Sequence, residues 1–392
     1  MTYITAAEAA KLWNVSLRAV QKWAKEGKIS GATKIGRDWN IPENSINPLN
    51  KTSPTEKIVT IEESCSITMP LMNGAFQPGN AKKYIKSLGN QNSKNVATAE
   101  YYYFSGQAQN ASKQAETAIN CNDKSIRLSA LLVHSFSNIA LGNTKIAKQD
   151  FDAIQLSIME ENTTEVEKAI AIFISSMTVV LLHDINNEPL QLESFVKYLP
   201  NGMKLYSFYA LAHLWYLKGD YSRSLGIAES GLAMLNNCYP ISIIYLNLIS
   251  AMDSMNLQQT ERGKEYFDKA WNMAKKDNFL QPFAEHHGLL QGLIESQLKR
   301  SEPELYKKII DITGQFSNGW RKLHNTSTNE TIADGLTTTE FSIAMLVNKK
   351  WTISRIAAHL QFSERTVKNY IACIYQKLGI KNRSDLKKHM LK

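Results

Sequence analysis

The strongest constraint on this chain is a series of short capped helices within residues 336–392. Thr337 and Glu340 have the spacing of a capping box, which opens a first helix. Thr352 precedes a second helix whose apolar residues recur at positions i, i+3, i+4 and i+7. Ser363 follows after a short gap and begins a third amphipathic helix. Two short helices joined by a tight turn predict a helix-turn-helix unit.

The outer face of the third predicted helix is polar and basic. It carries Arg365, Thr366, Lys368, Asn369, Gln376 and Lys377. Arg and Lys side chains donate to guanine or phosphate, and Asn pairs with adenine. The same face could be the solvated side of a small helical bundle. However, residues 336–392 hold eleven Lys or Arg and three Asp or Glu, and this excess of +8 nearly equals the +9 of the whole chain. This concentration of charge favours binding to nucleic acid.

Residues 336–392 resemble the LuxR-type (GerE-like) DNA-binding domain. The resemblance is carried by Leu336-Thr337 with Glu340, Ile356-Ala357, Leu360 with Ser363, Thr366-Val367-Lys368-Asn369, Lys377-Leu378-Gly379-Ile380 and Asn382-Arg383. It implies that the third helix enters the major groove, that Thr366, Lys368 and Asn369 face DNA, and that Lys377 contacts phosphate. It also implies that a fourth helix, after Ser384, pairs two such domains.

Three residues depart from this family pattern. Thr339 stands where Arg is usual, and Tyr370 replaces a frequent His. Lys350 stands near the usual glycine before the second helix. We expect Lys350 to strain a turn that glycine would enter freely.

Residues 1–50 show a second unit of the same kind. Thr5 and Glu8 form a capping box, and Ser16 caps the next helix. Gly27 is expected to end that helix in a left-handed conformation. Two extended runs follow, Ile29 to Ile35 and Trp39 to Ile41, and Gly36-Arg37-Asp38 joins them. This pattern predicts a β-hairpin, or wing, with Arg37 at its tip.

This N-terminal segment resembles the excisionase-like, MerR-related winged helix-turn-helix. The resemblance is carried by Ala6-Ala7-Glu8-Ala9-Ala10, Val15-Ser16, Val20-Gln21-Lys22-Trp23, Glu26-Gly27-Lys28-Ile29 and Gly36-Arg37-Asp38-Trp39-Asn40-Ile41-Pro42. It implies base or phosphate contacts by Arg18, Gln21 and Lys22, and a wing contact by Arg37. Asn14 replaces the usual turn glycine. The alternative is a module that docks on protein or positions DNA without reading it.

The middle of the chain is nearly neutral and predicted to be helical. Residues 51–335 have a net charge of −2, which is +9 less the +3 of residues 1–50 and the +8 of residues 336–392. Residues 51–80 are rich in Pro, Asn, Ser and Thr, which predicts a linker or docking arm. Its apolar run Ile67 to Met72 is expected to dock on the helices that follow.

Residues 81–325 show turn-like spots at a recurring interval. These spots are Phe104-Ser105-Gly106, Leu141-Gly142-Asn143, His183-Asp184, Lys218-Gly219-Asp220-Tyr221 and Met255-Asn256. The segment around Gly219 resembles a tetratricopeptide (TPR) helical pair, whose repeat is about 34 residues. The resemblance implies a solenoid with a concave face for a peptide, protein or small-molecule effector. The frequent aromatic residues are expected to fill the core between the helices.

No enzyme signature is present in the sequence. It lacks a phosphate loop, a zinc-protease motif, a nucleophile elbow and a dinucleotide fingerprint. Four cysteines lie far apart, and His213, His286 and His287 lack further ligands at metal spacing, so neither a cofactor nor a metal is expected. No signal peptide or membrane span is expected either. A cytoplasmic, nucleoid-associated protein fits these features.

We therefore expect a mainly α chain, with a TPR-like solenoid flanked by two small helix-turn-helix domains. The expected function is sequence-specific transcription regulation, with activation favoured by resemblance. Double-stranded DNA is the expected partner, RNA polymerase a further one, and a homodimer is plausible because one small domain buries little surface. Three alternatives stay open: a peptide-receptor regulator, a recombination accessory factor, and a scaffold that does not bind DNA.

Overall fold

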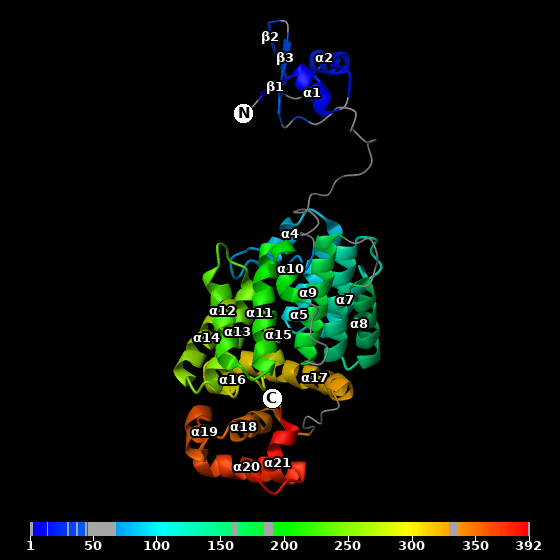
Figure 1. Ribbon diagram of the computed structural model, residues 1–392. Coiled ribbons are helices and arrows are strands. Elements are labelled where there is room, and N and C mark those ends of the chain that lie inside the picture. The colour runs from blue at the N-terminus through cyan, green and yellow to red at the C-terminus, as the bar shows by residue number, and fades with distance from the viewer. Residues whose placement is uncertain are drawn as a thin grey trace. The chain divides into compact units, whose positions relative to one another are not determined.

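The computed structural model describes most of the chain in two compact units. The described residues are 3–13, 15–29, 31–36, 38–43, 45, 68–158, 164–183, 191–328 and 335–390. One unit is Met1–Val59 and the other is Thr60–Lys392. Figure 1 shows that helices dominate and that the strands β1, β2 and β3 belong to the first unit. The expected fold class, mainly α with a helix-turn-helix domain at each end, is confirmed.

The N-terminal unit combines two helices with a small sheet. Its elements are β1 (Tyr3–Thr5), α1 (Ala6–Leu12), α2 (Leu17–Lys25), β2 (Thr33–Ile35) and β3 (Asp38–Pro42). The sheet is antiparallel in the order β1-β3-β2, with Ile4 opposite Ile41 and Lys34 opposite Trp39. The hairpin of β2 and β3 was expected. Strand β1 was not, because three residues directly before a helix cap carry no readable alternation.

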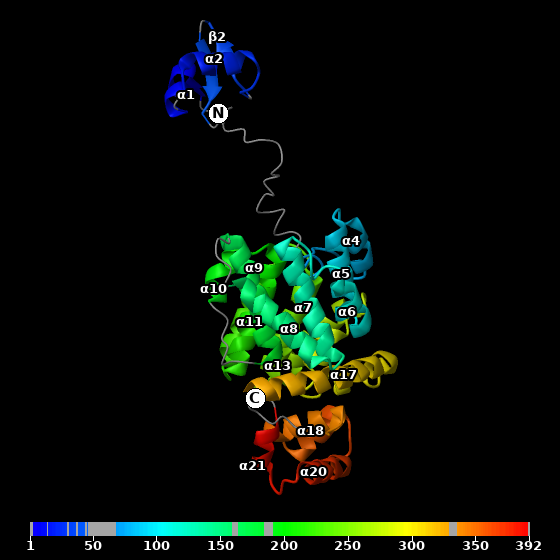
Figure 2. The ribbon, with the colours of Figure 1, turned by 90° about the vertical axis from the view of Figure 1, so that its right-hand side faces the viewer.

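Residues 68–328 form the helical body. Its helices are α4 (Ala81–Ser87), α5 (Gln91–Phe104), α6 (Ala108–Glu116), α7 (Lys124–Ala140), α8 (Thr144–Ile158), α9 (Glu165–Leu182), α10 (Leu192–Phe195), η3 (Val196–Tyr198), α11 (Asn201–Leu217), α12 (Tyr221–Ala233), α13 (Pro240–Asn256), α14 (Thr260–Ala274), α15 (Gln281–Glu285), α16 (Leu293–Leu298) and α17 (Pro303–Thr328). Successive helices pack side by side, with α5 on α6, α7 on α8, α11 on α12 and α13 on α14 (Figures 1 and 2).

The turn-like spots expected from the sequence lie at helix ends. Helices α5, α7, α9, α11 and α13 each end at one of them. Gly106, Gly142 and Gly219 follow three of these ends with φ of 75°, 76° and 82°. Glycine enters this left-handed region without the steric cost of a Cβ atom. At the α13 turn Gln258 adopts the same conformation with φ of 64°, which explains why this repeat was harder to recognise.

The long helix α17 crosses the ends of the earlier helices (Figure 2). It contacts α7, α8, α9 and α15. Two turns approach it closely. A Cβ atom on Gly106 would lie 2.2 Å from Cδ1 of Ile312, and one on Gly319 would lie 1.8 Å from the carbonyl oxygen of Ile139. The α17 backbone therefore lies directly against the end of α7.

Residues 68–80 fold onto the helical body. The buried carboxylate of Glu100 accepts hydrogen bonds from the backbone N–H groups of Leu71 and Met72, at 3.0 and 2.9 Å. Burial raises the pKa of Glu100 to about 8, although these two hydrogen bonds oppose the shift. Asn73 Oδ1 accepts from the Gly202 N–H at 3.0 Å. The arm is thus held by buried polar contacts as well as by Leu71 and Met72 in the core. The rest of the expected linker, residues 51–67, lies outside the described residues.

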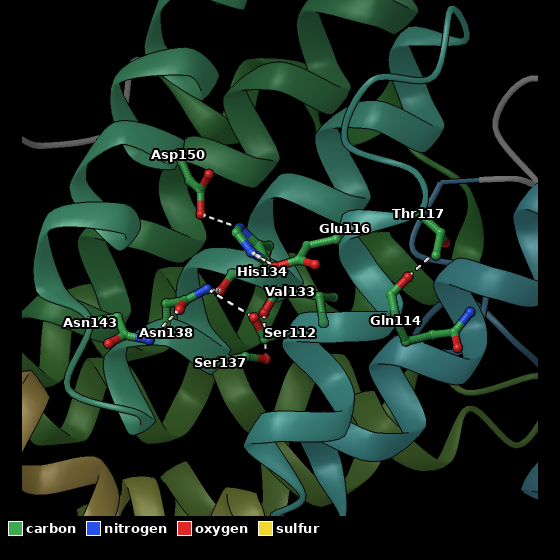
Figure 3. Close-up of polar contacts among 10 residues, drawn as sticks. All are labelled: Ser112, Gln114, Glu116, Thr117, Val133, His134, Ser137, Asn138, Asn143 and Asp150. Atoms are coloured by element: carbon green, nitrogen blue, oxygen red, sulfur yellow. Dashed lines mark hydrogen bonds and ion pairs between the residues drawn. The ribbon is translucent and has the colours of Figure 1, made fainter.

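A buried polar network ties α6, α7 and α8 together (Figure 3). His134 Nδ1 lies 2.7 Å from Asp150 Oδ2, and its Nε2 lies 3.6 Å from Glu116 Oε1. Burial favours the neutral imidazole, but the hydrogen bond and charge of Asp150, followed by Glu116, leave the pKa of His134 above its usual value. The protonated His134 therefore stabilises this part of the body.

We expect this network to make stability depend on pH. A raised folded pKa contributes stability that is complete below the unfolded pKa and is lost as pH rises through the folded pKa. His134→Gln should therefore cost about 1 kcal/mol of unfolding free energy below pH 6, and less above pH 7. Urea unfolding of both proteins at several pH values measures this. A cost that does not change with pH would contradict protonation of His134.

Candidate nucleic-acid interface

The C-terminal domain, residues 335–390, contains the helices expected there. They are α18 (Thr338–Asn348), α19 (Ile353–Leu360), α20 (Glu364–Leu378), α21 (Arg383–Leu386) and the 3-10 turn η4 (Lys387–His389). Thr337 and Glu340 form the predicted capping box. Thr352 and Ser363 cap α19 and α20 through their side-chain oxygens. Val367 and Ile374 are buried and fix which face of α20 points inward.

The outer face of α20 presents hydrogen-bond donors to solvent. Arg365, Lys368, Asn369 and Gln376 are exposed. Thr366 is half-buried, and its hydroxyl lies 2.8 Å from Ser363 Oγ within the helix cap. Arg365 and Lys368 can donate to guanine or phosphate, and Asn369 can pair with adenine. Because Arg365, Lys368 and Asn369 lie in the first half of the helix, they occupy the part of a recognition helix that meets base edges.

Lys377 lies in a different setting from these residues. Its Nζ is 2.7 Å from Oε2 of Glu340 on α18. Burial opposes ionisation of Glu340, but the hydrogen bonds from Lys377 and Thr337 hold the pKa of Glu340 below its usual value. Lys377 therefore joins α20 to α18 through an ion pair. The phosphate contact expected for Lys377 remains a prediction, and such a contact would share its ammonium with Glu340.

Lys350 adopts the left-handed conformation that the sequence suggested, with φ of 64°. We expect Lys350→Gly to stabilise the C-terminal domain by about 1 kcal/mol, because glycine lacks the Cβ clash of this region. Lys349→Gly is a matched control, since Lys349 has φ of −76°. Thermal unfolding of the two variants compares them. Equal effects of both substitutions would argue against strain at Lys350.

The N-terminal unit also presents a basic helix face. Thr5 with Glu8 caps α1, Ser16 caps α2, and Gly27 ends α2 with φ of 68°, as expected. Arg18 and Lys22 on α2 are exposed, while Gln21 is half-buried. Lys22 Nζ lies 3.9 Å from Glu26, a separation at which an exposed pair contributes little. Arg37, the expected wing contact, lies outside the described residues.

The sequence did not reveal that the C-terminal domain packs on the helical body. Ser342 Oγ on α18 donates to Glu295 Oε1 at 3.0 Å, and His287 Nε2 lies 2.9 Å from the same oxygen. His359 Nε2 on α19 lies 2.9 Å from the carbonyl oxygen of Gln291. Arg355, also on α19, contacts the side chains of Gln258 and Thr260.

One sequence signal for this packing was available. Residues 342–347 of α18 are almost entirely apolar and all are buried. A helix that is apolar all round is covered on every side, and a small domain cannot cover its first helix by itself. The body helices α16 and α17, which contact α19 and α18, provide the missing cover (Figure 1).

Other kinds of site were also considered. Among the described residues, no group of three or more His, Cys, Asp or Glu side chains could hold a metal ion. Within the same residues no helix is long and apolar enough to cross a membrane. Most of the aromatic side chains singled out in the sequence fill the core, since Tyr103, Phe104, Tyr216, Trp271 and Trp320 are buried.

Comparison with known families identifies both ends of the chain. Residues 328–390 match the family of bacterial regulatory proteins, luxR family. Residues 3–47 match a helix-turn-helix domain family. No match to a curated protein was found. Both families are DNA-binding regulatory domains, which supports binding to double-stranded DNA and a role in transcription regulation. The chain carries a LuxR-family helix-turn-helix domain at its C-terminal end and a second helix-turn-helix domain at its N-terminal end.

Proposed function

We propose that the protein is a transcription activator that recognises its target sequence through α20. The carrying observation is the exposed face of Arg365, Lys368 and Asn369 on a domain with a net charge of +8. Lys and Arg neutralise phosphates and release counterions, which gives affinity with a steep salt dependence. Lys368 and Asn369 add sequence discrimination of about 1–3 kcal/mol for each good base contact.

The N-terminal domain supplies a second DNA contact. Arg18 and Lys22 are solvent-exposed on the helix that follows the turn, and Gln21 lies between them. Arg37 would act as the wing contact by resemblance. Two linked DNA-binding domains raise avidity when both sites can be engaged together. A homodimer formed through the segment after Ser384, and contact with RNA polymerase, complete the proposed activator.

The helical body is proposed to be a TPR-like sensor of a peptide, a protein or a small molecule. Its paired helices and the repeated left-handed turns at Gly106, Gly142 and Gly219 support this assignment. The C-terminal domain packs on this body through α18 and α19. An effector that binds the body more tightly in one arrangement would shift the equilibrium of the DNA-binding domain by that difference in affinity.

The test is DNA binding by the full-length protein at several salt concentrations. We expect the logarithm of the association constant to fall linearly with the logarithm of salt concentration, with a slope of about −0.9 for each phosphate contacted. Chromatin immunoprecipitation of the full chain and of a chain lacking residues 1–50 then locates the targets. Loss of some sites on truncation would support a second reader. No salt-sensitive binding to any duplex would leave the scaffold alternative.

A further inference from the structure

A cavity lies between the helical body and the C-terminal domain. Its volume is about 70 Å³. The body wall comes from α15, α17 and the residues that follow α9 and α15, and the opposite wall comes from Leu336, Thr338 and Phe341 of the C-terminal domain. A site for one water molecule takes roughly 10–15 Å³, so the cavity has room for about five or six non-hydrogen atoms. This volume suits a small metabolite and excludes a peptide.

The lining offers two opposite charges. Glu285 and Arg321 both face the cavity, together with His183 and His287. Burial lowers the pKa of His183 to about 3, which leaves it neutral. His287 is already paired with Glu295 at 2.9 Å. One carboxyl group and one guanidinium therefore determine the electrostatics of this site.

Glu285 is held in place from the side opposite the cavity. Its Oε2 accepts a hydrogen bond from Tyr245 at 2.7 Å, and its Oε1 accepts one from Tyr103. Burial raises the pKa of Glu285 to about 7, against the effect of these hydrogen bonds. Each carboxylate oxygen can accept a second hydrogen bond. A nearby ammonium group would favour the ionised form of Glu285 and occupy this remaining capacity.

We propose that this cavity binds a small zwitterionic amino acid of the size of glycine or alanine. The ammonium group lies at Glu285 and the carboxylate at Arg321. A simple anion or cation of the same size would leave one of the two charged groups without a partner in a partly buried site. This inference rests on the proposed function, because it identifies the effector and the site through which the helical body senses it.

An occupied cavity would hold the C-terminal domain against the body. The ligand contacts α17 on one side and α18 on the other, next to the Ser342–Glu295 hydrogen bond. In this docked arrangement Arg355 of α19 is bound to Gln258 and Thr260. The first helix of a helix-turn-helix pair crosses the DNA backbone, where an Arg side chain would contact phosphate. The amino acid therefore lowers DNA affinity by stabilising the arrangement that occupies Arg355.

Calorimetric titration of the full-length protein tests the ligand. Glycine or L-alanine should bind with a dissociation constant of about 1 mM or lower. Acetate and methylammonium, which each carry one of the two charges, should bind at least roughly tenfold more weakly. L-Tryptophan should not bind, because of its size. Absence of binding by both glycine and L-alanine, or equal binding of acetate, would overturn the proposal without any variant.

Substitutions locate the site. Glu285→Gln and Arg321→Gln should each weaken amino-acid binding at least roughly tenfold. Lys322→Gln is the matched control, because it removes the same charge from the next residue, which is exposed and does not line the cavity. Thr338→Leu fills the cavity from the C-terminal domain and should also abolish binding. Unchanged binding in Arg321→Gln and Thr338→Leu would place the ligand elsewhere and refute this site.

DNA affinity, measured with and without amino acid on the same protein, tests the coupling. We expect glycine or L-alanine to weaken DNA binding about fivefold or more in the wild type, and to have no effect on Arg321→Gln. Amino-acid binding without any change in DNA affinity would refute the effector role. If DNA binds but amino acids do not, only this inference fails. If no DNA binds under any salt condition, the proposed function fails whatever the calorimetry gives.

Discussion

Gly319→Ala is expected to destabilise the helical body by about 3 kcal/mol or more, the range seen when a buried backbone contact is forced apart. The added Cβ atom would lie 1.8 Å from the carbonyl oxygen of Ile139 and 2.8 Å from its carbonyl carbon. Both are backbone atoms at the end of α7, so no side chain can rotate away to make room. Relief requires α17 to move away from the helices it crosses.

Gly314→Ala is the matched control for this prediction. It places the same substitution in the same helix, but nothing lies within 4 Å of the added atom. Replacing an unobstructed glycine inside a helix by alanine should stabilise by about 0.5–1 kcal/mol, since alanine has the higher helix propensity. Urea unfolding of the two variants should therefore give free-energy changes of opposite sign. A loss in both variants, or a gain in both, would mean that α17 does not lie against α7 as described.

The sequence predicted local features of this protein well. The capping boxes at Thr5 and Thr337, the cap at Ser363 and the left-handed residues Gly27 and Lys350 all occur where they were expected. Each depends on hydrogen bonds or steric contacts within about four residues along the chain. Such interactions are fixed by neighbouring residue types, so the printed order of amino acids is enough to recognise them.

Contacts between distant segments could not be predicted in the same way. Gly319 and Ile139 meet only because α17 crosses the end of α7, and nothing in either local sequence identifies its partner. The contact of Ser342 with Glu295 is of the same kind. The apolar run of α18 indicated that it needs cover, but a pattern of burial does not identify which helix provides that cover.

The candidate site shows the same division. Helical spacing predicted that Lys368 and Asn369 share the outer face of α20, and both are exposed there. The ion pair of Lys377 with Glu340 was not anticipated. It joins two helices whose relative placement depends on the packing of the whole domain. A basic residue near a recognition helix can therefore serve the domain's own stability as well as a phosphate.

Lys368→Ala and Asn369→Ala are each expected to weaken binding to the target sequence roughly tenfold to a hundredfold, which corresponds to about 1–3 kcal/mol per lost base contact. Binding to unrelated duplex should change much less, because base contacts carry the discrimination and phosphate contacts carry the shared affinity. Both side chains are exposed, so their removal should leave the fold intact. Competition titrations with target and unrelated DNA measure the two affinities separately.

Lys377→Ala and Lys387→Ala separate this loss from a general effect of charge. Lys377→Ala should weaken both kinds of binding about equally and flatten the salt dependence if its ammonium contacts phosphate. It should also lower the stability of the C-terminal domain, because Glu340 loses its partner at 2.7 Å. Lys387 lies in η4, away from α20, and its removal should preserve sequence preference. Genomic footprints that are identical for the wild type and Lys368→Ala would show that α20 does not select the sequence. Identical footprints together with an unchanged salt slope in Lys377→Ala would remove α20 from the DNA interface altogether.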